Sequence, residues 1–174
     1  GPDDTASPLF YWHIGGLQRY LPAILSLLAP NINSYRRIQR YNAAPINVQW
    51  GLDNRTVGLR VPDSTSQSRR VENRVPGADA NPYLAIAASL ACGLLGMINR
   101  IDPSAPISGS AYEMPYELPR SLEQSLVALN ECPELIEILG SHFVQAWTSV
   151  KEKEHETFLH VISSWEREHL LLNV

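Results

Sequence analysis

Arginines concentrate in one segment of the chain, residues 36–74. Eight arginines stand there against three acids, so the segment carries +5 in a chain whose net charge is −4. Guanidinium groups stay charged, and their planar fork of donors matches carboxylate and phosphate oxygens. So many of them would repel one another unless an anion lies among them, so the segment predicts an anion-binding site. The arginines are Arg36, Arg37, Arg40, Arg55, Arg60, Arg69, Arg70 and Arg74.

The run at residues 69–76 carries the one acid placed among closely spaced arginines. Its alternation is typical of a half-buried strand, on which Glu72 shares a face with Arg70 and Arg74. Two flanking guanidinium groups would hold Glu72 ionised. An ionised carboxylate beside phosphate-binding groups suits Mg²⁺, which binds through few carboxylates plus substrate phosphates. A solvated strand face with a surface ion pair explains the same residues, and both interpretations stay open here.

Other common catalytic patterns are absent from the sequence. None of the five histidines pairs at the i, i+4 spacing that puts two metal ligands on one helix face. The chain has no Gly-x-Ser-x-Gly nucleophile elbow, no Walker loop and no Gly-x-Gly-x-x-Gly. A nucleotide would therefore have to be bound through the arginines.

Composition predicts one globular domain with a sizeable core, since 44% of the 174 residues are hydrophobic. Cys92 and Cys132 form no disulfide framework, which favours a reducing, cytoplasmic setting. Because the basic residues are confined to one segment, we expect no nucleic-acid and no membrane partner. The longest uncharged run, Pro82–Asn99, is short and rich in Ala and Gly, so we expect a buried helix there.

Two apolar helices are predicted to flank the basic segment. Ser7-Pro8 supplies a cap and a first-turn proline for a helix to Leu28. Its Gly15-Gly16 pair indicates either close packing against another backbone or a break. Asn81-Pro82 repeats the start signal for a helix Tyr83–Met97, whose apolar residues go all round, as in a helix buried on every side.

Between these helices the period changes to two. Val48–Leu52 and Thr56–Val61 are strand-like runs, and Asp53-Asn54-Arg55 between them predicts a hairpin. Arg70–Val75 would add a third strand. We therefore expect a short antiparallel sheet that carries the arginines and Glu72, covered by helices.

The C-terminal half is predicted to be mostly helical, which makes the fold class α+β. Ser121 and Gln124 form a capping box that opens a helix to Asn130. A short helix follows at Glu134–Leu139, and a long amphipathic helix is expected over Ser141–Leu171.

Three blocks together resemble the glutamine synthetase family: Asn33–Arg37, Asp53–Pro62 and Arg69–Leu84. The blocks resemble the family in their residues, in their order and in their spacing. The resemblance covers essentially this whole chain but only the C-terminal part of the family's length. It implies that residues 1–174 are the C-terminal portion of such a catalytic domain, without the N-terminal domain and the first half of the catalytic domain.

The resemblance implies a reaction in which the ATP γ-phosphate passes to the side-chain carboxylate of glutamate and an amine attacks the γ-glutamyl phosphate. Arg37 and Arg74 match arginines that bind glutamate, and Arg74 also meets the transferred phosphate, which makes it the candidate catalytic residue. The implied partners are glutamate, a small amine and further copies of the parent in a homo-oligomeric ring. Active sites form between its subunits, so we expect this chain alone to be inactive.

The nucleotide and metal sites are implied in the same way. Arg55, Arg60 and Arg70 match positions around the ATP phosphates, and Glu72 matches a ligand of the divalent metal, Mg²⁺ or Mn²⁺. Guanidinium groups and a metal would neutralise charge in a loose phosphoryl-transfer transition state.

Two departures from the family pattern bear on the amine. Enzymes that use ammonia carry a Glu two residues before the proline at Pro45, where this chain has Ala43. The loop Asp63–Ser68 also lacks the lysine that such enzymes often place there. Both departures resemble the γ-glutamylputrescine synthetase branch, which predicts an organic amine. An ammonia-using glutamine synthetase and a non-catalytic ligand-binding or sensor relative remain the alternatives.

Tyr116 aligns with a tyrosine that some bacterial glutamine synthetases adenylylate. A packing role explains the same residue.

Overall fold

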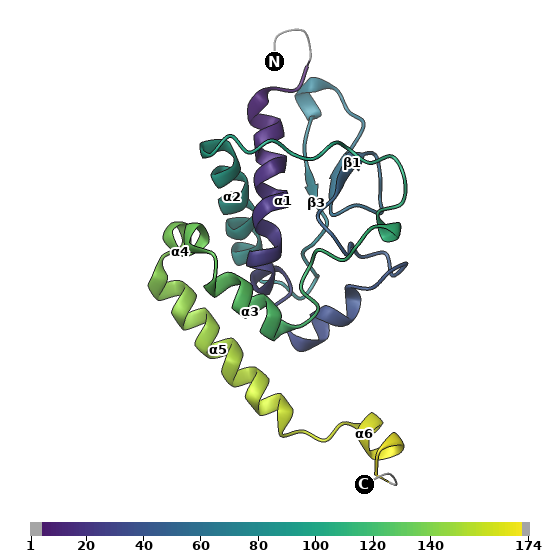
Figure 1. Cartoon of the computed structure of the whole chain (residues 1–174), viewed down its shortest axis with the longest axis vertical. Helices are drawn as coiled ribbons and strands as arrows, with labels where there is room; N and C mark the ends of the chain where they lie inside the picture. The colour runs from purple at the N-terminus through teal and green to yellow at the C-terminus, as the bar shows by residue number, and fades with distance from the viewer. Residues whose placement is uncertain (1–4, 172–174) are drawn as a thin grey trace.

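The computed structural model describes residues 5–171, and its centre is a pair of helices that lie side by side, α1 (Pro8–Leu28) and α2 (Pro82–Ile98) (Figure 1). Both begin as the sequence predicts. Ser7 accepts a hydrogen bond from the backbone N–H of Phe10 at 3.4 Å, and Asn81 accepts one from Tyr83 at 3.0 Å. α1 runs unbroken through Pro22, so of the two explanations for its glycine pair a break is wrong.

The two helices touch backbone to backbone through glycines. A Cβ added to Gly16 would collide with the backbone of Cys92 and Gly96, and one added to Gly96 would collide with the backbone of Trp12 and Gly16. The expected close packing is therefore confirmed. Only residues without a side chain permit this approach.

A three-stranded sheet lies beside the helix pair, in the order β1 (Trp50–Leu52), β2 (Leu59–Val61), β3 (Glu72–Asn73) (Figure 1). β2 and β3 are antiparallel as expected, but β1 and β2 are parallel, so the predicted hairpin is wrong and the sheet is mixed. The α+β class is confirmed.

The reason lies in the connection between β1 and β2. The side chain of Asn54 accepts the Thr56 N–H at 2.9 Å and donates to the carbonyl of Gly109 at 2.8 Å. The turn is thus attached to a distant segment, and the chain returns to start β2 parallel to β1. The strands are also shorter than predicted.

The main core forms where α1 meets the sheet and the C-terminal helices. The largest fully buried side chains are Ile14, Leu17, Leu21, Ile24, Leu25, Leu27, Leu28, Ile38, Ile46, Leu59, Leu129 and Leu135. Short 3-10 turns, η2 (Ile32–Arg37), η3 (Ser66–Ser68) and η4 (Ala111–Glu113), connect the larger elements.

Within the described chain, the C-terminal part has four helices: α3 (Leu122–Asn130), α4 (Pro133–Leu139), α5 (Ser141–Leu159) and α6 (Ser164–His169). The prediction of one helix over Ser141–Leu171 is wrong, because a second helix start interrupts it. Ser163 accepts the Glu166 N–H at 3.2 Å and the Glu166 carboxylate accepts the Ser163 N–H at 2.7 Å, which is a capping box. α5 extends away from the body, and α6 lies at its far end (Figure 1).

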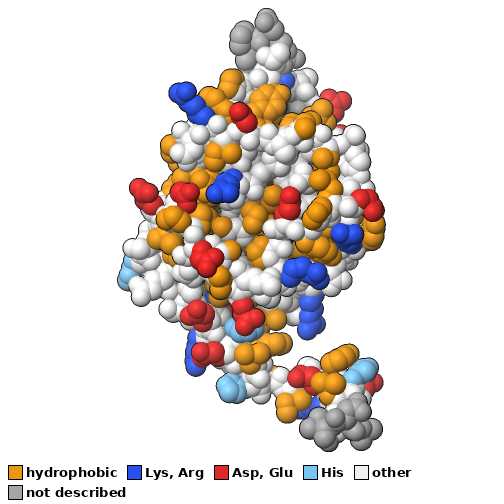
Figure 2. All heavy atoms as spheres, viewed as in Figure 1, with side chains coloured by type: hydrophobic (Ala, Val, Ile, Leu, Met, Phe, Trp, Pro, Cys, Tyr) orange, Lys and Arg blue, Asp and Glu red, His pale blue; other side chains and the backbone are white. Residues whose placement is uncertain are grey.

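Several apolar side chains are exposed, and two groups of them lie on helices. Figure 2 shows them on α6 and the segment before it, where Val161, Ile162 and Trp165 are each more than half exposed. On α2, Tyr83, Leu90 and other apolar residues of one face are exposed, so the expectation that this helix is buried on every side is wrong in this chain. Among residues 5–171, no helix has the length and apolar character of a membrane span.

Candidate active site

Glu72 lies at the centre of an ion-pair cluster on the sheet. Its Oε2 accepts from Nη1 of Arg60 at 2.7 Å, and its Oε1 accepts from Nη2 of Arg70 at 3.2 Å. The other terminal nitrogen of Arg60 donates to Asp53. The hydrogen bond from Arg60, supported by Arg70, holds the pKa of Glu72 below its usual range, against a smaller opposing effect of burial. The expectation that paired arginines keep Glu72 ionised is thus supported.

Two arginines bind Glu72, as predicted, but only one of them, Arg70, is the residue that was expected. The other is Arg60, whereas the strand alternation predicted Arg74. β2 and β3 are antiparallel, and Arg60 is directly opposite Glu72. Directly opposite side chains on one sheet face are closer than neighbours two residues apart on the same strand, so the cross-strand arginine binds the carboxylate. Asp53, which sequence reasoning treated as part of a turn, completes the cluster.

Arg74 binds backbone carbonyls instead. Its Nη1 donates to the carbonyls of Arg55 and, at 3.1 Å, Val57, and its Nη2 donates to the carbonyl of Ala43 at 3.2 Å. β3 ends at Asn73, which lets the side chain of Arg74 turn toward these loops. Arg74 therefore ties the β1–β2 connection to the loop that contains Ala43.

Arg37 binds the backbone just after Arg74. Its Nη2 donates to the carbonyl of Val75 at 2.5 Å, and its half-buried side chain has a pKa lowered by burial, which the charge of Asp79 partly offsets. Asp79 itself accepts from the Ser34 hydroxyl at 2.5 Å. Val75, whose carbonyl Arg37 binds, directly follows Arg74 in the chain. Arg37 therefore lies close to the backbone of Arg74.

Arg55 and Arg70 are the exposed members of the predicted set. Arg55 makes no ion pair within residues 5–171, and Arg70 pairs with Glu72 alone there. Three of the six predicted site residues share the ion-pair cluster, namely Arg60, Arg70 and Glu72. Arg74 binds the backbone carbonyl of Arg55, and Arg37 binds the carbonyl of the residue after Arg74.

The loop at residues 39–44 contains Ala43, singled out above, and Tyr41, which the sequence did not single out. Tyr41 and Ala43 both have left-handed backbone, with φ of 61° and 56°. The hydroxyl of Tyr41 donates to Oε1 of Glu113 at 2.5 Å. The tyrosine and the acid are 72 residues apart, so no local pattern indicated their contact.

Tyr116 packs between two arginines. The guanidinium carbons of Arg40 and Arg120 lie 5.5 and 4.3 Å from the centre of its ring. Its hydroxyl accepts the backbone N–H of Arg40 at 3.4 Å. These contacts give the residue a packing role, and its modification stays a prediction.

The side chains in this part of the protein can supply one ligand to a metal ion. Within residues 5–171 no group of three or more His, Cys, Asp or Glu side chains is arranged to hold a metal ion, and Glu72 is a single carboxylate beside arginines. Because Mg²⁺ binds through one or two carboxylates plus substrate phosphates, Glu72 is compatible with that role when further ligands come from outside this chain.

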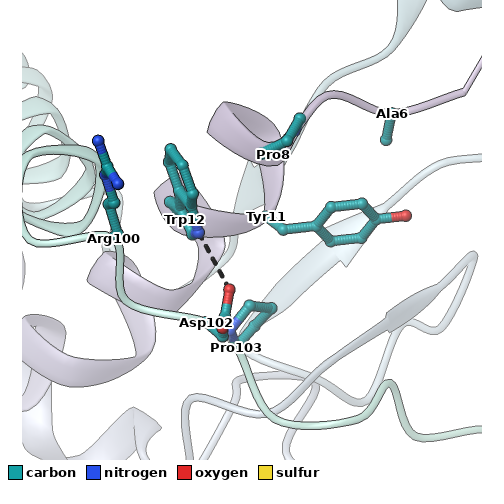
Figure 3. A pocket seen from close by; sticks show the side chains of 7 residues that line it. All are labelled: Ala6, Pro8, Tyr11, Trp12, Arg100, Asp102 and Pro103. Carbon is teal, nitrogen blue, oxygen red and sulfur yellow. Dashed lines mark hydrogen bonds between the residues drawn. The ribbon is translucent and has the colours of Figure 1, made fainter. Parts of the chain in front are cut away.

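A surface pocket of about 650 Å³ lies elsewhere (Figure 3). Its two charged groups both face Trp12: the indole N–H donates to Asp102 at 3.0 Å, and Arg100 lies 5.7 Å from the ring centre. The cavity contains none of the predicted site residues. It is lined by Ala6, Pro8, Tyr11, Trp12, Arg100, Asp102 and Pro103.

Comparison with known proteins decides the family. The model of the glutamine synthetase catalytic domain matches residues 1–170. The chain belongs to the glutamine synthetase family. Type-1 glutamine synthetase 2 of Dictyostelium discoideum is 39% identical over 171 residues, 95% of this chain and 33% of the relative.

Two relatives in the glutamine synthetase family are named for larger amines. A glutamate–isopropylamine ligase of Pseudomonas sp is 38% identical and covers 92% of this chain and 36% of its own length. The γ-glutamylputrescine synthetase PuuA of Escherichia coli K12 is also 38% identical, over 96% of this chain and 36% of its own length. Overall identity therefore does not separate the branches of the family.

Two solved structures of GmaS show the same fold. GmaS without ligand superposes with a TM-score of 0.85 at 32% identity, covering 98% of this chain and 40% of GmaS. A GmaS complex with ADP superposes with a TM-score of 0.84 at 29% identity, over 98% of this chain and 41% of GmaS. The chain thus spans about a third to two fifths of the length of these relatives.

Proposed function

We propose that the full-length protein is an ATP-dependent ligase that joins the side-chain carboxylate of glutamate to an organic amine. Family membership supports the ligase class, and the GmaS complex with ADP supports a nucleotide substrate. This chain supplies the C-terminal part of the catalytic domain. The remainder of the parent, arranged in a ring with neighbouring copies, supplies the rest of the pocket.

In this proposal the arginines neutralise charge during phosphoryl transfer. Arg55 and Arg70, both exposed, bind ATP phosphates, and Arg60 binds the phosphates while it keeps Glu72 in place. Arg37 binds glutamate. Arg74 binds glutamate and the transferred phosphoryl group from a position fixed by three carbonyls. Preorganised positive groups of this kind stabilise a loose transition state without reorganisation during the reaction.

Glu72 would hold a divalent metal, which when bound bridges and neutralises phosphate oxygens. The low pKa of Glu72 favours this role because the carboxylate stays deprotonated. Arg60 and Arg70 orient that carboxylate in this chain. The protein's own part is therefore to present one ionised oxygen ligand at a defined position on β3.

Ala43 is the observation that carries the choice of amine. The position is exposed, and its methyl group offers neither charge nor hydrogen bond to an ammonium ion. A carboxylate there would bind ammonium and assist its deprotonation. Its absence leaves space for a substituted amine next to the loop that Arg74 holds.

The second candidate is an ammonia-using glutamine synthetase. The 39% identity to type-1 glutamine synthetase 2 favours it as strongly as the 38% identity to PuuA favours an organic amine. Only turnover distinguishes the two.

The test measures ATP- and glutamate-dependent phosphate release by the full-length protein with ammonium, isopropylamine or putrescine, and with this chain alone as control. We expect turnover with an organic amine, little with ammonium, and none by the isolated chain. Turnover with ammonium alone would establish the second candidate, and none with any amine would favour a non-catalytic relative.

The Ala43→Glu variant tests the assignment of that position. We expect it to shift the preference toward ammonium, because the added carboxylate restores a partner for the small cation. An Ala43→Gln variant is the matched control, since it adds similar bulk without charge. Equal amine preference in both variants would remove the argument from Ala43.

A further inference from the structure

Two carboxylates hold Arg60, one from each side of its strand. Its Nη1 donates to Oε2 of Glu72 at 2.7 Å, and its Nη2 donates to Oδ1 of Asp53. The side chain of Arg60 is only 15% exposed, and its Nε is buried without a hydrogen-bond partner. Within residues 5–171, the two carboxylates therefore provide the hydrogen bonds that fix the guanidinium.

The register of the sheet explains why the second carboxylate comes from beyond the end of β1. Glu72 is directly opposite Arg60 on β3, whereas the residue opposite Arg60 on β1 is Gly51, which has no side chain. A Cβ added to Gly51 would lie 2.5 Å from the carbonyl oxygen of Ile107, so no larger residue fits there. Asp53, two residues further along the chain, supplies the carboxylate on this side of Arg60.

The backbone around Asp53 is fixed by hydrogen bonds. The N–H of Asp53 donates to the carbonyl of Val61 at 2.8 Å, and the next residue, Asn54, donates to the carbonyl of Gly109 at 2.8 Å. Asp53 has a left-handed backbone with φ of 48°, which aspartate adopts more readily than most residues because its short polar side chain can hydrogen-bond locally. The carboxylate therefore has a defined position relative to β2.

The contact between Asp53 and Arg60 matters more for orientation than for stability. The Asp53 side chain is 62% exposed, and ion pairs with an exposed member contribute little to folding. Each terminal nitrogen of a guanidinium carries two N–H donors, so Arg60 keeps one donor on each after it binds both carboxylates. Because the guanidinium is bound at two different nitrogens, it cannot turn, and its two remaining donors have fixed directions.

We propose that Asp53 is a positioning residue for phosphoryl transfer, which acts by holding Arg60 in the orientation that binds phosphate. The inference rests on the proposed function, in which Arg60 binds ATP phosphates. Glu72 alone does not provide this constraint, because a single contact lets the guanidinium turn about it and the same carboxylate also binds Arg70. Preorganised donors stabilise a transition state because their directions are set before the reaction.

A purely electrostatic role for Asp53 predicts a different result. A negative charge beside phosphate-binding arginines opposes the charge of a nucleotide, so its removal should favour nucleotide binding. If Asp53 positions Arg60, its removal should impair turnover without weakening nucleotide binding, and the loss should depend on whether a hydrogen-bond acceptor remains at this position.

The experiment uses two variants of Asp53 in the full-length protein. Asp53→Gly removes the side chain and permits the left-handed backbone. Asp53→Asn keeps a neutral acceptor of the same shape and also tolerates that backbone. The control is Asp63→Asn, the same substitution at an exposed aspartate that makes no ion pair among residues 5–171.

Each protein is assayed for phosphate release at varied ATP and titrated calorimetrically with ADP, and crystal structures of the wild type and of Asp53→Gly show the position of Arg60. We expect Asp53→Gly to lower kcat about tenfold, as for loss of one charge-assisted contact, and to change the KM for ATP by less than about threefold. Asp53→Asn should lower kcat about threefold, because its amide oxygen still accepts from Arg60.

The affinity for ADP should stay the same or rise by up to about threefold in both Asp53 variants, because an opposing charge is removed. Asp63→Asn should match the wild type. In the crystal structure of Asp53→Gly, the guanidinium of Arg60 should be displaced from its wild-type position.

A wild-type kcat in Asp53→Gly would overturn the inference. Equal losses in the two Asp53 variants would assign the effect to charge alone and would also overturn it. So would an Arg60 that keeps its position in the crystal structure of Asp53→Gly, whatever the turnover. If the wild-type protein turns over no amine while Asp53→Gly displaces Arg60, the proposed function is refuted and Asp53 remains the residue that positions Arg60.

Discussion

Replacement of Arg74 by lysine should destabilise this chain even in the absence of any ligand. Lysine keeps the charge but replaces a planar fork of donors by one compact ammonium group. The guanidinium of Arg74 reaches three carbonyls, those of Arg55, Val57 and Ala43. A lysine can retain one of these contacts, so two are lost.

The expected size follows from those two contacts. Arg74 is half-buried, and a typical hydrogen bond contributes about 1 kcal/mol net, so the loss is about 2 kcal/mol. For a chain of this size 1 kcal/mol corresponds to about 2–4 °C in Tm, which predicts a decrease of about 4–8 °C. Amide hydrogen exchange should also accelerate in the β1–β2 connection, because its carbonyls lose their anchor.

Thermal unfolding followed by circular dichroism measures the change, with Arg55→Lys as the control. Arg55 is exposed and makes no ion pair within the described residues 5–171, so its replacement should alter Tm by no more than about 2 °C. If the two variants unfold at the same temperature, Arg74 does not hold these loops. The proposed preorganisation of Arg74 for catalysis would then be refuted.

Two further predictions concern the helix pair and the ion-pair cluster. Gly96→Ala should lower the free energy of unfolding by about 2 kcal/mol or more in urea titrations, despite a gain of about 1 kcal/mol in helix propensity, because the new Cβ meets the backbone of α1. Gly109→Ala, where a Cβ meets no atom within 4 Å, should be nearly neutral, and equal effects would contradict the close contact. Glu72→Gln should flatten the decline of Tm between pH 6 and pH 3. The lowered pKa of Glu72 gives stability that is complete above the ordinary carboxyl pKa of about 4.3 and is lost as pH falls through the folded value, so an unchanged decline would argue against the pairing with Arg60.

Elements that begin with local signals were predictable from the sequence. Ser7 and Asn81, each followed by a proline, set the starts of α1 and α2 within one residue. The break before α6 carries an equally local signal, because Ser163 and Glu166 have capping-box spacing. The expectation of one helix over Ser141–Leu171 rested on the amphipathic pattern and did not take this capping signal into account.

Strand pairing depended on contacts that sequence spacing does not reveal. The parallel pairing of β1 and β2 relies on Asn54 binding Gly109, 55 residues away. The presence of arginines near Glu72 was predictable, because they are close to it in the sequence. Its main partner, Arg60, was not, because strand pairing brings the two residues together. The contact between Tyr41 and Glu113 lay entirely outside the reach of local pattern.

The connection between β1 and β2 also constrains the order of folding. Parallel neighbours are usually joined by a dozen or more residues, yet here residues 53–58 suffice, and the guanidinium of Arg74 occupies the inside of the turn. That group comes from the residue after β3, so the turn has its anchor only when β3 has paired with β2. We therefore expect β2 and β3 to pair first and β1 to join last, so that the sheet assembles in the reverse of its order along the chain.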